Sequence, residues 1–435
     1  MPNSDDIIRD DRECVWHPFT WMPGYLAGEP LVITGAEGIT LVAADGTRYM
    51  DGISSMWLNV HGHARAEIAE AIAEQAKRFC HVSVFGQTHE LATTLARRLV
   101  EMTPEGLNHV FYSDDGATAV EVALKIAFQS AQIRGETKRT KFVALEHAYH
   151  GDTLGAASVG DIEHFHHTFR PLLFDCIHAP APTGFPFDDA RARDAARDNA
   201  LAALDRIFDE HADETCAFII EPIVQGAAGM LIHPEGYLAG ARKLCTKHGI
   251  PMIADEVFVG FGRTGTMFAC ERENVSPDIL CLAKGLTGGT VPVAVTLSSE
   301  SIYDAFLGDD PTACTFFHGH SYCANPVGCA AALASLDLFE KDVTLRQVAR
   351  LEGQLSEAAF CFRRLGAVGD ARFIGLIFAI DVGGANEICA AARKRGLLIR
   401  PLGDVVYLTP PLVTTEDELA RMITVLYDAV TEVTE

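Results

Sequence analysis

Four short and almost uninterrupted apolar runs are the feature that most constrains the fold of this chain. They read "KFVALE", "AFIIEPIV", "PMIADEV" and "DILCLA". Runs without polar alternation are typical of strands covered on both faces, as in a parallel sheet with crossover helices. Segments with apolar residues at three- to four-residue spacing, such as "AEIAEAIAEQAKRF" and "GYLAGARKLCTKHG", surround these runs. The pattern predicts an α/β fold built on a mostly parallel sheet.

The two ends of the chain have a different pattern of predicted helices and strands. Near the N-terminus, "ITLVAADGTRYMDG" predicts a hairpin that turns at Asp45-Gly46. After about residue 325 we expect a long, interrupted helical stretch, a strand pair near "FIGLIFAIDV", and a last helix that begins with a capping box, Thr415 to Glu418. Because 435 residues are too many for one compact core, we expect a large domain at 60–325 and a smaller α+β domain formed by 326–435 together with 1–59.

Charge and composition exclude several kinds of partner. The net charge of −24 disfavours binding to nucleic acid and to anionic membranes, because both are negatively charged. No apolar run reaches the roughly 18 residues of a membrane-spanning helix, and the acidic N-terminus does not resemble a secretory signal. We therefore expect a cytoplasmic protein.

Cysteine and histidine are plentiful but lack metal-binding patterns. The twelve cysteines include no C-x-x-C pair, and several lie in apolar runs, which favours buried free thiols. The histidine-rich passages "HFHH" and "HGH" lack the spacing of a helical zinc site. No metal is expected.

One motif suggests a dinucleotide. Gly260, Gly262 and Gly265 follow an apolar run and spell G-x-G-x-x-G. A dinucleotide site, however, also needs a helix after the glycines and an acid about 20 residues on. Here a proline at 277 interrupts the following segment, and the next apolar run ends in Lys284. This context argues against a nicotinamide or flavin enzyme.

Two polar residues at predicted strand ends point to a different cofactor. Asp255 ends one apolar run and Lys284 follows the next, and open α/β sheets bind ligands at the carboxyl ends of their strands. Desolvation lowers the pKa of a lysine and yields the neutral amine that forms a Schiff base. A carboxylate that keeps a pyridine nitrogen protonated is the second group that pyridoxal phosphate requires. The pair therefore predicts a pyridoxal phosphate site.

Two further passages supply what such a site needs. In "YSDDGATAVEVALKIA", Gly116 and Ala117 follow a strand and open a helix, so their amides and the helix dipole can hold a phosphate. In "EHAYHGDT", Tyr149 offers an aromatic plane for stacking on the pyridine ring, with Asp152 close behind it.

Together these passages resemble the class III aminotransferases, which have fold type I, the aspartate aminotransferase fold. The resemblance covers nearly the whole chain and depends most on "SDDGATAVEVALKIA", "AYHGDT", "ADEVFVGFGRTG" and "LAKGLTGG". It implies an α/β large domain with a small α+β domain, pyridoxal 5′-phosphate as cofactor, and a homodimer with active sites at the subunit interface. The resemblance also implies that the catalytic residues are Lys284, Asp255 and Tyr149.

The resemblance assigns further residues to the cofactor and the substrate. Ser321 falls where the family places a side chain that binds the phosphate held by the neighbouring subunit, and Arg400 where it binds a substrate carboxylate by a bidentate contact. The implied cofactor-binding residues are Gly116, Ala117, Tyr149, Asp255, Val257, Lys284 and Ser321. The implied substrate-binding residues are Phe19, Met56, Trp57, Asp152 and Arg400.

The passages "VWHPFT", "DGISSMWLNVHGH" and "LIRPLGDVVYLTPPL" narrow the resemblance to the branch of the class that aminates 7-keto-8-aminopelargonate in biotin synthesis. Members that use S-adenosylmethionine as amino donor typically have a Trp-Trp pair where this chain has Met56-Trp57, and a tyrosine at the position of Phe19. They also tend to have a serine at the position of Ala117 and Pro-Thr at that of His320-Ser321. The donor therefore stays open between S-adenosylmethionine and lysine, and a broader ω-aminotransferase acting on diamines, β-amino acids or amine–pyruvate pairs is the alternative.

Overall fold

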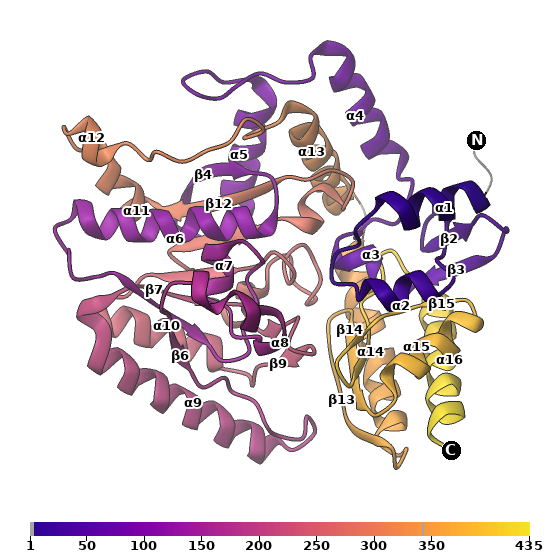
Figure 1. Cartoon of the computed structure of the whole chain (residues 1–435). Coiled ribbons are helices and arrows are strands. Elements are labelled where there is room, and N and C mark those ends of the chain that lie inside the picture. The colour runs from indigo at the N-terminus through magenta and orange to yellow at the C-terminus, as the bar shows by residue number, and fades with distance from the viewer. Residues whose placement is uncertain (1–3, 342) are drawn as a thin grey trace.

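The computed structural model describes residues 4–341 and 343–435. A seven-stranded sheet forms the centre of the larger part of the molecule (Figure 1). In order across the sheet, its strands are β4 (Leu107–Ser113), β12 (Ala294–Ser299), β11 (Ile279–Leu282), β10 (Met252–Asp255), β7 (Thr215–Ile220), β5 (Lys141–Leu145) and β6 (Ile177–Ala179). The four apolar runs are β5, β7, β10 and β11, which pair in parallel as expected. β12 alone runs antiparallel to its neighbours, so the α/β fold with a mostly parallel sheet is confirmed.

Helices cover both faces of this sheet, which explains why its strands lack polar alternation. Successive residues of β10 face opposite cores: Met252 and Ala254 lie in one, and Ile253 in the other. On the side of Ile253 lie α6 (Gly116–Ile133), α7 (Leu154–Ser158) and α11 (Glu300–Asp304). On the opposite side lie α5 (Glu90–Met102), α9 (Ala190–His211), α10 (Tyr237–His248) and α13 (Pro326–Lys341).

The short elements of this part of the chain lie around these layers. α4 (Ala66–Arg78) packs against α13. The remaining α-helices and strands here are α8 (Glu163–His166), α12 (Pro311–Cys314), β8 (Val224–Gln225) and β9 (Leu231–Ile232), and short 3₁₀-helices lie between the larger elements.

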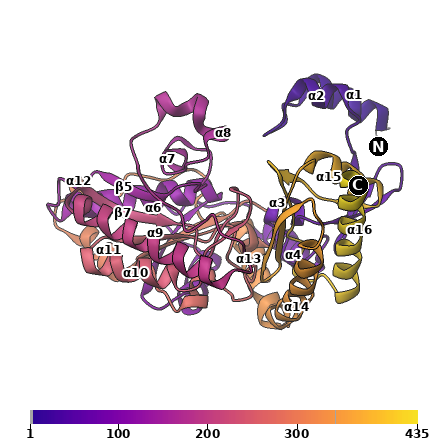
Figure 2. The same ribbon diagram turned by 90° about the horizontal axis from the view of Figure 1, so that it is seen from below.

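Chain ends that are far apart in sequence lie together beside the large sheet (Figures 1 and 2). The predicted hairpin is present as β2 (Thr40–Ala43) and β3 (Arg48–Asp51), and β3 pairs in parallel with β15 (Leu397–Leu398) near the C-terminus. β1 (Ile33–Glu37) completes this sheet. Because the N-terminal hairpin joins a C-terminal strand, the first and last parts of the chain fold as neighbours.

A second four-stranded sheet and three helices complete the C-terminal part. The strands are β13 (Val368–Ile374), β14 (Ile377–Val382), β17 (Val405–Leu408) and β16 (Pro401–Leu402). The helices are α14 (Thr344–Phe362), α15 (Ala385–Lys394) and α16 (Glu416–Thr434). The capping box predicted for the last helix is present: the Thr415 side chain accepts from the Glu418 amide, and the Glu418 side chain accepts from the Thr415 amide.

Two helices near the N-terminus were not predicted, α1 (Ser4–Cys14) and α2 (Met22–Ala27). Neither has a buried residue. The only large apolar residues of α1 are Ile7 and Ile8, and α2 has six residues that include Pro23 and Gly24, so neither shows a repeating apolar pattern in the sequence. All twelve cysteines are free thiols, and half of them are buried. Among the described residues, every helix is too short or too polar to cross a membrane.

Candidate active site

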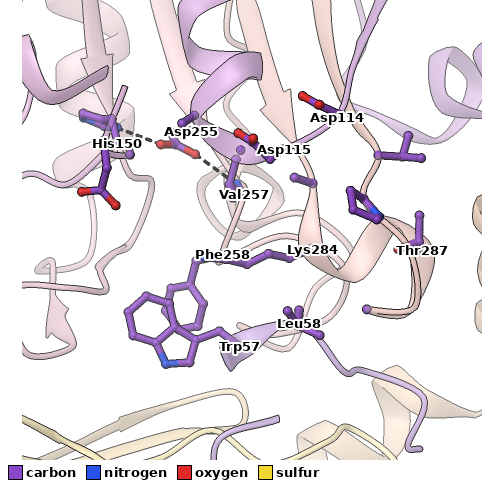
Figure 3. Close-up of a pocket in the computed structure, with 18 of the residues that line it drawn as sticks. Trp57, Leu58, Asp114, Asp115, His150, Asp255, Val257, Phe258, Lys284 and Thr287 are labelled. Carbon is purple, nitrogen blue, oxygen red and sulfur yellow. Dashed lines mark hydrogen bonds and ion pairs between the residues drawn. The ribbon is translucent and has the colours of Figure 1, made fainter. Parts of the chain in front are cut away.

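A cavity of about 780 Å³ lies where β10 and β11 end (Figure 3). Asp255 is the last residue of β10, and Lys284 follows β11 after a single residue. Most of the residues expected at the site line this one cavity. They are Trp57, Gly116, Ala117, Tyr149, Asp152, Asp255, Val257 and Lys284.

The amine of Lys284 lies among aromatic rings. Its Nζ is 4.8 Å from the centre of the Trp57 ring and 5.6 Å from that of Phe258. Burial lowers the pKa of Lys284 to about 8, although the charges of Asp255 and Glu221 oppose the shift. The backbone of Lys284 is left-handed, with φ of +44°, a strained conformation for a side chain with a Cβ that is typical of functional sites. The amine is therefore partly neutral near physiological pH, as a nucleophile requires.

Asp255 is buried and held from two sides. One carboxylate oxygen lies 2.8 Å from Nδ1 of His150, and the other accepts a hydrogen bond of 3.1 Å from the Val257 amide (Figure 3). His150 lies within the "AYHGDT" passage, but nothing in its local sequence indicates a role. Its partner is 105 residues away along the chain, so only the fold reveals the pair.

Glu221 is a second buried acid in the cavity that sequence reasoning missed. Its carboxylate accepts hydrogen bonds from the amides of Tyr149 (3.0 Å) and Gly226 (2.9 Å). Burial raises the pKa of Glu221 to about 7. Glu221 therefore links the loop after β5, which contains Tyr149, to the loop after β7.

Tyr149 is oriented by its own neighbour. Its hydroxyl donates a hydrogen bond of 2.7 Å to Asp152. Burial, followed by this hydrogen bond, raises the pKa of Tyr149 far above its usual range. The phenol therefore stays protonated and fixed in place.

The N-terminus of α6 opens into the same cavity. Asp115 caps the helix by accepting from the Thr118 amide. The amides of Gly116 and Ala117 lie in the first turn and have no partner within the helix. A Cβ at Gly116 would lie 2.5 Å from Cγ1 of Val257. The absence of a side chain there lets the first turn approach Val257 and leaves its amides available for an anion.

Four of the expected residues lie outside the wall of the cavity. Phe19 is 54% exposed and meets Phe165 edge to face at 5.1 Å, and Phe165 meets Tyr149 at 5.9 Å. Met56 is partly exposed on the turn that carries Trp57.

Arg400 and Ser321 complete this group. Arg400 is half-buried near Tyr407, and no hydrogen bond or ion pair joins it to another residue in the described part of the chain. Ser321 is exposed in a turn, next to His320, whose Nε2 lies 3.4 Å from Asp114.

The glycine motif does not form a dinucleotide-binding turn. Gly262 and Gly265 have φ of +86° and +98°, and the segment continues through turns into a single turn of 3₁₀-helix, Ala269–Glu273. Arg263, between the glycines, is buried and donates hydrogen bonds to the carbonyls of Leu376 and Pro410. The motif therefore lacks the helix that a pyrophosphate needs.

The described residues contain one group with the spacing of metal ligands, away from this cavity. It consists of Asp205 and Asp209 of α9 and His248 of α10. Nζ of Lys247 lies 2.7 Å from Asp205 and already balances part of the negative charge.

Comparison with known proteins decides the family. The family model "Aminotransferase class-III" matches residues 26–430. The chain belongs to the class III aminotransferases. It is 46% identical to the adenosylmethionine-8-amino-7-oxononanoate aminotransferase of Geobacter sulfurreducens, over the full length of both chains. It is 39% identical to the enzyme of that name from Methanocaldococcus jannaschii, with 97% of each chain covered.

Solved structures agree with this assignment. The Methanocaldococcus jannaschii enzyme superposes with a TM-score of 0.94 at 38% identity, covering 99% of both chains. An (S)-enantioselective ω-transaminase from Thermomicrobium roseum superposes with a TM-score of 0.95 at 31% identity, covering 100% of both. A PLP-bound amine transaminase from an uncultivated Pseudomonas species gives 0.91 at 35%, covering 96% of this chain and 98% of that one. The aminotransferase therefore has fold type I, and its cofactor is pyridoxal 5′-phosphate.

The cavity fits this cofactor. A lysine amine with a lowered pKa suits an aldehyde, a buried carboxylate suits a protonated pyridine nitrogen, and the first turn of a helix suits a phosphate. All three groups line one space of sufficient volume.

Proposed function

We propose that this aminotransferase converts 7-keto-8-aminopelargonate to 7,8-diaminopelargonate in biotin synthesis. The observation that carries the proposal is the placement of the Lys284 amine and the Asp255 carboxylate in one cavity. Relatives identical in 36–46% of positions and bearing the name of this activity support it.

The two residues that carry the proposal have distinct roles in this reaction. When bound, pyridoxal phosphate supplies an electron sink for the amino-acid carbanion. Asp255, held by His150, keeps a proton at the pyridine nitrogen. Lys284 is the residue that would bind the cofactor covalently, and its amine would act as the general acid–base that moves the proton of the substrate carbon. This is ping-pong chemistry: the donor would give up its amino group and leave as its carbonyl product before the acceptor ketone binds and receives that group.

Other residues hold the cofactor in place. The amides of Gly116 and Ala117 bind the phosphate. Tyr149, fixed by its hydrogen bond to Asp152, would cover one face of the cofactor ring, and Val257 would pack on the other face. The contribution of these groups to catalysis is to hold the reacting atoms in a fixed geometry. They can do so because each is itself fixed by the backbone or by a hydrogen bond.

Other residues would bind the parts of the substrate that lie away from the cofactor. Arg400 has no carboxylate partner among the described residues, so it is available for a bidentate contact with the carboxylate of 7-keto-8-aminopelargonate. Trp57, Phe19 and Met56 supply apolar surface for the aliphatic chain between that carboxylate and the reacting ketone. Asp152 faces the same space.

We also infer a homodimer located in the cytoplasm. Ser321 lies in an exposed turn whose neighbours Phe317 and Tyr322 are 75% and 61% exposed, with Phe85 nearby at 66%. Large exposed aromatic side chains gathered in this way favour burial against a second chain. In the dimer, Ser321 contacts the phosphate bound by the partner subunit. The charge of −24 argues against nucleic-acid or membrane partners.

Half-reactions test the proposal and identify the donor. The cofactor-loaded protein is mixed with S-adenosylmethionine or lysine separately, and the visible absorbance is followed. We expect one of the two donors to remove the visible absorbance of the bound cofactor and 7-keto-8-aminopelargonate to restore it. A colourless protein that takes up no cofactor would refute the proposal.

The alternative is a broader ω-aminotransferase, which the similarity to the Thermomicrobium roseum enzyme favours. A panel of acceptors separates the two functions. If 7-keto-8-aminopelargonate is inert while simple ω-amines react with pyruvate, the alternative is correct.

A further inference from the structure

The turn that carries Trp57 into the cavity is strained. Over α3 (Ser54–Trp57), three residues have left-handed backbone: Ser54 at φ +51°, Ser55 at +62° and Trp57 at +65°. Ser55 also has ψ of −63°, which is the geometry of a rare γ-turn. Side chains with a Cβ disfavour these conformations, which persist only where surrounding contacts fix them.

Asp51 supplies contacts at the centre of this turn. Its side chain is 1% exposed. One carboxylate oxygen accepts from the Ile53 amide at 3.2 Å, and the other accepts from the Ser55 amide at 2.7 Å. Nε2 of His63 lies 2.9 Å from the second oxygen and fixes its direction.

The two ends of the turn have other anchors. The Ser54 hydroxyl donates to the carbonyl of Thr409 at 2.6 Å and accepts from Arg263 at 3.1 Å. The Trp57 indole donates to the Tyr407 hydroxyl at 3.1 Å. Asp51 is therefore the side chain that holds the middle of the turn, where the backbone departs furthest from ordinary geometry.

We propose that Asp51 is a positioning residue of the active site: it holds the strained turn and thereby places the Trp57 indole beneath the Lys284 amine. Figure 3 shows Trp57 and Phe258 together on the side of the cavity opposite Asp255, with the Lys284 side chain between these rings and Asp255. The two ring planes are tilted by 44°. Without the Asp51 carboxylate, the turn relaxes and the indole leaves this position. The functional consequence rests on the substrate-binding role proposed above for Trp57.

Fluorescence can follow Trp57 alone. The chain has three tryptophans, and Trp16 and Trp21 are 87% and 78% exposed, whereas Trp57 is 8% exposed. Replacing Trp16 and Trp21 by phenylalanine leaves Trp57 as the sole tryptophan of the full chain, so that selective excitation of tryptophan reports on it alone. Acrylamide quenching then measures its burial, both with the cofactor bound and after its removal.

Asp51→Ala in this background is expected to raise the quenching constant several-fold and to shift the emission to the red. Asp51→Asn, which keeps one oxygen acceptor, should fall between it and the parent. Asp45→Ala is the matched control, because Asp45 also accepts from a backbone amide, that of Thr47, but in the exposed turn of the same hairpin. It should leave the quenching of Trp57 unchanged.

The proposal is overturned if the quenching constant of Trp57 in both Asp51→Ala and Asp51→Asn equals that of the parent. It is also overturned if Asp45→Ala raises the quenching constant as much as Asp51→Ala does. If Asp51→Ala does not fold, Asp51→Asn decides. For the folded variants we also expect the KM for 7-keto-8-aminopelargonate to rise more than kcat falls. If Trp57 becomes exposed while that ketone proves inert even for the parent, the proposed function fails and the role of Asp51 stands.

Discussion

The pH dependence of Lys284 tests the physical basis of the site. A pKa of about 8 leaves about one amine in ten neutral at pH 7. An ordinary lysine, with a pKa of 10.5, would have about one in three thousand. The difference is a few hundred-fold in the concentration of the nucleophile. Burial is its main cause, and it outweighs the opposing charges of Asp255 and Glu221.

Competitive labelling measures this pKa directly. The full chain, freed of cofactor, is treated with a limiting amine-directed reagent from about pH 6 to pH 11, and the modification of each lysine is quantified by mass spectrometry. Lys247 is an internal control, since its hydrogen bond to Asp205 raises its pKa above 10.5. We expect labelling of Lys284 to reach its midpoint about two pH units or more below that of Lys247. Asp255→Asn should lower the midpoint of Lys284 further, because it removes a charge that favours the ammonium.

A midpoint for Lys284 above pH 10 would refute the desolvation argument. The same shift also predicts a stability effect. The folded chain binds the proton of Lys284 less tightly than the unfolded chain does. Lys284 therefore lowers the free energy of unfolding, by its full amount below pH 8 and by progressively less as the pH rises from 8 to 10.5. Lys284→Met should therefore stabilise the cofactor-free protein at pH 7, by at most about 3 kcal/mol, and should gain nothing at pH 10.5.

Three further predictions follow from contacts in the structure. Gly116→Ala should weaken cofactor binding at least about tenfold, because the new Cβ would lie 2.5 Å from Cγ1 of Val257; cofactor titration measures it. Gly353→Ala, in the interior of α14 with no atom within 4 Å of the new Cβ, should instead raise the free energy of unfolding by up to about 1 kcal/mol without changing cofactor affinity. His150→Ala should weaken cofactor binding about 10- to 100-fold, since it removes a 2.8 Å hydrogen bond to the charged Asp255; unchanged affinity would contradict this.

The sheet could be predicted because its strands are buried on both faces. Burial on both sides produces the uninterrupted runs of β5, β7, β10 and β11, and no other short element requires them. The direction of β12 could not be predicted in this way, because an antiparallel strand at the same depth has the same composition. α1 and α2 escaped prediction since a helix with no buried residue needs no apolar stripe.

The same distinction applies to the active site. Asp255 and Lys284 could be predicted because each lies at the end of a recognisable strand, and parallel strands bring their ends to one edge. His150 and Glu221 act through partners that only the fold brings near: Asp255 lies 105 residues from His150, and Tyr149 lies 72 residues from Glu221. Their local sequence carries no sign of these contacts.

The glycine motif shows why a spacing alone is ambiguous. Gly262 needs φ of +86°, and a Cβ there would lie 2.8 Å from Leu412. Arg263 beside it is buried and reaches the carbonyls of Leu376 and Pro410 in the C-terminal part of the chain. Gly262 lets the loop after β10 pack closely against the side chains of Leu412 and Leu345, whereas in a dinucleotide site such a glycine lets the backbone approach a pyrophosphate. Both uses require positions without a Cβ, so the glycines are equally compatible with either. The element that follows distinguishes them: a dinucleotide site continues into a helix whose free amides hold the pyrophosphate, whereas turns and a short 3₁₀-helix follow here.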